Sequence, residues 1–83
     1  MQIYRIEIEK PALKFINSRN KKERTRIFDA INKLPDEGDI KKMKGYDYHF
    51  RLRIGDIRII YEKYDNILKI VVIDAGNRGD IYK

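Results

Sequence analysis

The chain has 83 residues, enough for one domain with a modest core and too few for two. Hydrophobic residues make up 42% and charged residues 39%, as in an ordinary folded protein, and the absence of cysteine excludes a disulfide framework and thiolate chemistry. A net charge of +6 points to nucleic acid or another polyanion as the partner. No apolar run reaches spanning length and the first residues do not form a signal peptide, so we expect a cytoplasmic protein.

The first part of the chain predicts a strand and then a helical hairpin. Residues 3–8 alternate loosely between apolar and polar side chains, as a short strand does. Pro11 fits the first turn of a helix, where its missing N–H costs nothing. Asn20 and Glu23 have the form of an N-cap and its capping partner, which starts a second helix. This helix closes at Leu34, because the residue before a proline avoids helical angles.

Residues 36–45 are expected to form the one real loop, acidic in its first half and basic in its second. Basic side chains neutralise backbone phosphates, so the three lysines of this loop are candidate RNA-binding residues: Lys41, Lys42 and Lys44. The many basic residues of the helical hairpin are more simply explained as the solvated face of two amphipathic helices.

Residues 48–61 predict a β-hairpin. Two alternating runs are joined by the pair Gly55–Asp56, which suits a two-residue type II′ turn. The resulting register places an apolar row on one face: Phe50, Leu52, Ile54, Ile57, Ile59 and Tyr61. The other face carries three arginines, with Arg53 directly opposite Arg58 and with Arg51 beside them.

This opposition of like charges is informative. Like charges across a strand pair destabilise it by a few tenths of a kcal/mol up to about 1 kcal/mol. Its presence indicates that an anion belongs between the arginines, and guanidinium groups suit phosphate oxygens. The alternative is a set of ordinary charges on a solvated sheet face, screened by salt.

Beyond the hairpin, Asp65–Asn66 predicts a second two-residue turn, which would place Glu62 opposite Lys69 in a favourable pair. Residues 67–73 read as a strand, and its four consecutive β-branched residues indicate a central strand buried on both faces. Residues 74–80 are expected to break it. The predicted fold is α+β: an N-terminal strand, a helical hairpin, then an antiparallel meander sheet with the helices packed on one face.

Few side chains could carry catalysis. His49 is the only histidine, and it shares the arginine face by alternation. No Cys/His cluster and no converging carboxylates indicate a metal site. A metal-independent reaction remains open, the cleavage of RNA by its own 2′-hydroxyl, in which arginines would stabilise the pentacoordinate phosphate. Tyr82, four residues after Arg78, could move the proton, or could serve as an aromatic anchor for the core.

Three segments, Tyr48–Glu62, Ile73–Arg78 and Tyr82, resemble the RelE toxins of the RelE/ParE superfamily. The resemblance covers nearly the whole chain and implies a single RelE-like toxin domain over residues 1–83, with a microbial-ribonuclease-like fold and no cofactor. Such toxins enter the ribosomal A site and cut the messenger there. A partner antitoxin of the RelB type, wrapping their surface, neutralises them.

The resemblance also implies five catalytic positions: Arg51, Arg53, Arg58, Arg78 and Tyr82. The first two stand where the family commonly places two basic residues that hold the phosphate region. Both are arginines here, which hardly exchange protons, so their role would be electrostatic. The next two arginines match those that stabilise the transition-state phosphate and the leaving group. The tyrosine matches a proposed general base that also stacks on a messenger base.

Two other functions stay open at this point. One is a ParE-type inhibitor of DNA gyrase without nuclease chemistry, which would not need the arginine and tyrosine set. The other is a catalytically silent module that binds RNA or the ribosome through the same arginine face.

Overall fold

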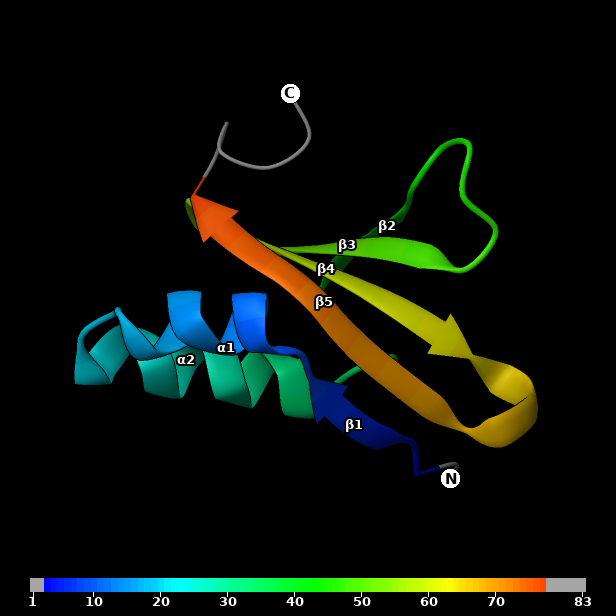
Figure 1. Ribbon diagram of the computed structural model, residues 1–83, viewed down its shortest axis with the longest axis horizontal. Coiled ribbons are helices and arrows are strands. Elements are labelled where there is room, and N and C mark those ends of the chain that lie inside the picture. Colours follow the sequence, from blue (N-terminus) through cyan, green and yellow to red (C-terminus); the bar gives the residue numbers. More distant parts are fainter. Residues whose placement is uncertain (1–2, 78–83) are drawn as a thin grey trace.

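The computed structural model describes residues 3–77, and Figure 1 shows two helices against one face of a twisted sheet. The elements follow in this order: β1 (Arg5–Ile8), α1 (Lys10–Asn17), α2 (Lys21–Asn32), β2 (Asp39–Lys42), β3 (His49–Ile54), β4 (Ile57–Tyr64), the 3₁₀ turn η1 (Asp65–Ile67) and β5 (Lys69–Asn77). The strands lie in the order β1-β5-β4-β3-β2. The predicted α+β architecture is therefore confirmed.

Local signals in the sequence set the two helices. α1 has its proline in the first turn, and the Asn20 side chain caps α2 by accepting a hydrogen bond from the Glu23 N–H at 2.9 Å, as predicted. Ile27 and Ile31, four residues apart, are fully buried and hold α2 on the sheet. Neither helix in residues 3–77 is long and apolar enough to cross a membrane.

The central hairpin has the predicted register. Arg53 pairs with Arg58, and the predicted apolar row of the two strands faces the helices. Gly55 has a φ of 58° whereas Asp56 has a negative φ, which is the pattern of a type II′ turn and favours glycine at the first position. The core below this hairpin contains, among others, Leu52, Ile59 and Tyr61, each at most 1% exposed.

The prediction that residues 36–45 form only a loop is wrong. Asp39–Lys42 forms the edge strand β2, paired antiparallel with β3. This strand has four residues, of which Ile40 alone is partly buried. So short a segment with so little apolar pattern gives no period-2 signal, and its pairing with β3 decides its conformation.

The connection between β4 and β5 also differs from the prediction. η1 replaces the two-residue turn, and Leu68 leaves it in the left-handed region with a φ of 50°. Tyr64 rather than Glu62 is paired with Lys69, so the predicted Glu62–Lys69 pair is wrong. Lys69 instead makes an ion pair with Glu7 of β1, with its Nζ 3.2 Å from a carboxylate oxygen.

β5 is the central strand that the β-branched run predicted, with β1 parallel on one side and β4 antiparallel on the other. It continues through Asn77, so the expected break does not occur at residues 74–77. The register shifts at Ile73, which is left unpaired between Val72 (opposite Tyr61) and Asp74 (opposite Ile60). This β-bulge puts Asp74 on the face away from the helices.

Candidate nucleic-acid interface

The face of the sheet away from the helices carries the candidate site. In β3 and β4, side chains alternate between the two faces, and the helices cover only the apolar one (Figure 1). We call the other side the arginine face, and define it by its charged and titratable residues on these two strands: His49, Arg51, Arg53, Arg58 and Glu62. The three arginines predicted to share a surface therefore do so.

Arg51 lies at the middle of the arginine face. It pairs with Ile60 of β4 and with Lys41 of β2. Ile60 is completely buried although it does not belong to the core under the helices, so the arginine face is not open to solvent at this position. Arg51 is half-buried, and its Nε atom is shielded from solvent without a hydrogen-bond partner among the described residues.

Arg53 already has an anion beside it. Its Nε and Nη2 atoms both lie 2.8 Å from one carboxylate oxygen of Asp39, on the neighbouring strand β2. The two side chains are 50% and 56% exposed, so the ion pair is solvated. Sequence analysis missed Asp39, because its position opposite Arg53 depends on a strand that the apolar pattern does not reveal.

Arg58 is the arginine directly opposite Arg53. It is half-buried, and its neighbour on the other side is Gly76, which is itself buried. Within residues 3–77, Arg58 makes no ion pair. Guanidinium groups bind phosphate oxygens through paired hydrogen bonds, so Arg58 is the member of the face best placed to accept a phosphate.

His49 and Glu62 form a cross-strand pair at the far end of the arginine face. The imidazole Nε2 lies 3.4 Å from a Glu62 carboxylate oxygen, and each side chain is about a quarter exposed. Sequence analysis missed this contact, although the predicted hairpin register, continued by one pair beyond Phe50 and Tyr61, places His49 opposite Glu62.

The three predicted RNA-binding lysines do not share one surface. Lys41 lies opposite Arg51 and so belongs to the same side of the sheet. Lys42 lies opposite Phe50, whose ring packs against the core, and therefore projects from the other side. Lys44 is exposed in the loop between β2 and β3. Arg78 and Tyr82, the remaining predicted catalytic residues, lie outside the described residues.

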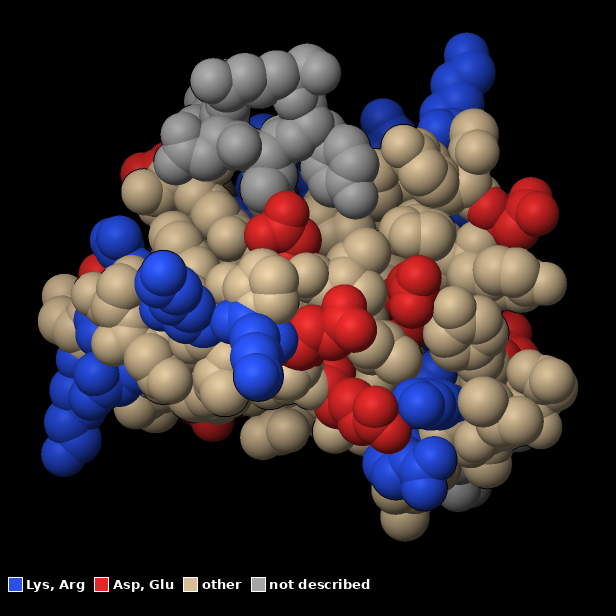
Figure 2. Space-filling model, viewed as in Figure 1, with Lys and Arg blue, Asp and Glu red and all other residues tan. Residues whose placement is uncertain are grey.

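Charge is unevenly distributed over the molecule. Figure 2 shows acidic side chains gathered over β1 and β5, in the middle of the viewed face.

Residues 3–77 contain no group of three or more histidine, cysteine, aspartate or glutamate side chains that could hold a metal ion.

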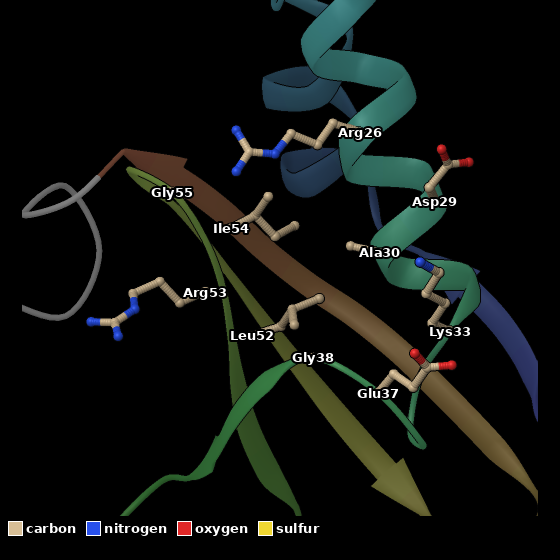
Figure 3. Close-up of a pocket in the computed structure, with 10 residues that line it drawn as sticks. All are labelled: Arg26, Asp29, Ala30, Lys33, Glu37, Gly38, Leu52, Arg53, Ile54 and Gly55. Carbon is tan, nitrogen blue, oxygen red and sulfur yellow. The ribbon is translucent and has the colours of Figure 1, made fainter.

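A groove lies on the opposite side of β3, between that strand and α2 (Figure 3). Its charged lining residues are three basic ones and two acidic ones: Arg26, Lys33, Arg53, Asp29 and Glu37. The guanidinium of Arg53 points away from α2 in Figure 3, on the side of β3 opposite Ile54. The groove and the arginine face thus share Arg53, and the rest of the groove lies on the helix side of the sheet.

No model of a known protein family and no curated protein matches the chain, but solved structures do. The RelE–RelB complex from Pyrococcus horikoshii OT3 matches with a TM-score of 0.79 and 24% identity, over 95% of this chain and 99% of that one. The RelB–RelE complex from Methanococcus jannaschii matches with a TM-score of 0.75 and 28% identity, over 92% and 94%. The isolated RelE toxin of E. coli matches with a TM-score of 0.75 and 18% identity, over 90% of this chain and 84% of that one. The chain therefore has the RelE fold, and the resemblance to the RelE toxins found in its sequence is confirmed.

Proposed function

We propose that this protein is the toxin of a type II toxin–antitoxin system. It is a ribosome-dependent, metal-independent endoribonuclease that cleaves messenger RNA in the A site and so inhibits translation. The observation that supports this most directly is the placement of Arg51, Arg53 and Arg58 on the sheet face away from the helices in a RelE fold. The solved neighbours are RelE toxins, either isolated or in complex with RelB.

The reaction that fits these residues uses the 2′-hydroxyl of the RNA itself. The hydroxyl loses its proton, its oxygen attacks the adjacent phosphorus, and the bond from phosphorus to the 5′-oxygen breaks. The products are a 2′,3′-cyclic phosphate and a 5′-hydroxyl, which takes up a proton. Negative charge builds up on the phosphate in the transition state, and preorganised guanidinium groups stabilise that charge.

The arginines differ in what they can contribute. Arg58 has no carboxylate partner among residues 3–77, so its charge is available to the phosphate, with half-buried Arg51 nearby. Arg53 shares its charge with Asp39 and holds the edge strand as well. None of them transfers protons, because a guanidinium stays protonated in proteins. We assign proton transfer to Tyr82 as the general base and leaving-group stabilisation to Arg78, from the family resemblance.

The same proposal covers partners and location. A RelB-like antitoxin would bind and neutralise this chain, as the RelB–RelE complexes among the solved neighbours suggest. The ribosome and its messenger are the targets, which requires the cytoplasm. Residues 1–83 would act as one toxin domain.

The test is a cleavage assay on translating ribosomes with a defined messenger, followed by mapping of the messenger ends. We expect cuts confined to the A-site codon, lost in Arg58→Ala and Tyr82→Phe. Lys33→Ala is the matched control, since Lys33 follows α2 on the helix side of the sheet and should leave cleavage unchanged.

Two outcomes would overturn the proposal. Uncut messenger together with inhibited supercoiling by DNA gyrase would identify a ParE-type inhibitor. Ribosome binding without any cutting would identify a silent binding module.

A further inference from the structure

The loop between β2 and β3 presents an aromatic ring beside the arginine face. The loop rises on the side of the sheet away from the helices (green in Figure 1). The Met43 N–H donates to the His49 carbonyl at 2.9 Å, and the Tyr46 N–H donates to the Met43 carbonyl at 3.3 Å. Gly45, with a φ of 87°, permits this tight turn. As a result Tyr46 returns toward the start of β3 with 45% of its surface exposed.

Tyr46 rests against the imidazole of His49. Their ring centroids are 4.9 Å apart and the planes are tilted by 48°. Glu62 holds His49 from the neighbouring strand, at 3.4 Å. His49 and Arg51 are two residues apart on one face of β3, a separation of about 7 Å. The exposed ring therefore lies at the His49 end of the arginine face, two residues along β3 from Arg51.

We propose that Tyr46 is a stacking site for a nucleobase of single-stranded RNA. Proteins that bind single strands combine basic side chains along the backbone with aromatic rings on which bases stack. Lys41 lies opposite Arg51, and Lys44 lies in the same loop as Tyr46, so basic groups adjoin the ring. The stacked base would belong to a nucleotide adjacent to the one whose phosphate contacts Arg51 and Arg58. That last placement rests on the proposed function, whereas stacking itself requires only RNA binding.

Tyr48 offers a matched control in the same loop. It is 54% exposed, similar to Tyr46, but its ring packs on Tyr64 with a centroid distance of 5.3 Å. Tyr64 in turn lies beside Glu62. Removing the Tyr48 ring deletes a comparable exposed aromatic and leaves the contact between Tyr46 and His49 in place.

The experiment measures the affinity of the purified protein for two labelled probes, by fluorescence anisotropy without ribosomes. One probe is a short single-stranded RNA, and the other is the same strand with abasic sugars. We expect Tyr46→Ala to weaken binding of the RNA by about 5- to 100-fold, the range found for single base–aromatic stacks, and to leave binding of the abasic strand unchanged. Tyr46→Phe should retain the RNA affinity, and so should Tyr48→Ala.

Every other pattern counts against the site. Unchanged RNA affinity in Tyr46→Ala overturns the inference, and so does an equal loss on both probes, which would mean that Tyr46 acts on the backbone or the fold. Melting temperatures of all variants verify folding. The two proposals fail separately: stacking without ribosomal cleavage removes the nuclease function alone, and cleavage with base-independent binding removes the stacking site alone.

Discussion

The two faces of the hairpin formed by β3 and β4 differ in what limits them. On the covered face, Leu52 and Ile59 lie directly opposite each other and are buried under the helices. On the arginine face, Arg53 and Arg58 lie opposite each other one residue further along the strands, and their like charges repel. The covered face is packed against the helices, whereas the arginine face holds like charges side by side. We therefore expect stability to depend mainly on the covered face and the proposed function on the arginine face.

The largest effect should come from the covered face. Ile59→Ala removes a fully buried side chain in contact with the main core, and we expect it to lower the free energy of unfolding by about 2–5 kcal/mol. Denaturant titration measures the loss. Arg51→Ala, in which half-buried Arg51 is removed from the other face, should cost clearly less. Equal losses for both would end the distinction between a structural and a functional face.

The converse change should affect activity and spare stability. Arg58→Ala should reduce ribosomal cleavage by about 10²–10³-fold, the loss seen when one preorganised donor to a transition-state oxyanion is removed. Its unfolding midpoint should stay near that of the unmodified protein, because Arg58 makes no ion pair within residues 3–77. Single-turnover cleavage and denaturant titration on the same preparation check both halves. A large fall in stability would show that Arg58 is structural.

The pKa of Tyr61, on the covered face, should report how well that face excludes water. Burial raises the pKa of Tyr61 to about 12, from an ordinary value of 10. The folded state therefore keeps the phenol protonated where the unfolded chain would ionise it. The resulting stabilisation is complete below pH 10 and is lost as the pH rises toward 12.

The measurement is the unfolding midpoint between pH 9 and pH 12, compared with Tyr61→Phe. The phenylalanine variant should lose less stability over this range, since it lacks the group that titrates. Parallel curves for the two proteins would contradict a buried, protonated Tyr61.

The smallest effect concerns the edge of the arginine face. Opposition to Arg58 alone would make Arg53→Ala stabilising, but Arg53 also pairs with Asp39, and these two contributions have opposite signs. We expect a net change close to zero. A double-mutant cycle of Arg53→Ala with Asp39→Ala should give a coupling of about 0.2–1 kcal/mol, as for other exposed ion pairs. A coupling of zero would mean that the pair does not hold β2.

Sequence alone predicted the features that depend on local pattern. The hairpin register followed from period-2 alternation around Gly55, and the cap of α2 followed from Asn20 and Glu23. The same reasoning collected three arginines on one face. Where the partners come from separate segments, the pattern along the chain was not enough to pair them. Asp39 lies opposite Arg53 only because β2 pairs with β3, and the four residues of β2 show no pattern that predicts this pairing.

The resemblance to a family supplied what the pattern could not. It assigned a role to Arg78 and favoured proton transfer over a core anchor for Tyr82, and both residues lie outside the described residues. It did not supply Tyr46, whose position depends on a loop that the strand pattern leaves open.

The bulge at Ile73 changes which residues of β5 face the helices. Before it, the even-numbered residues Ile70 and Val72 face the helices, and after it the odd-numbered Ala75 does. The parity of the strand thus switches once, which keeps the Asp74 carboxylate out of the apolar layer. If Ile73 alone were deleted, the residues on either side of it should keep their present faces of the sheet. A deletion elsewhere in β5 would move the side chains of part of the strand to the opposite face.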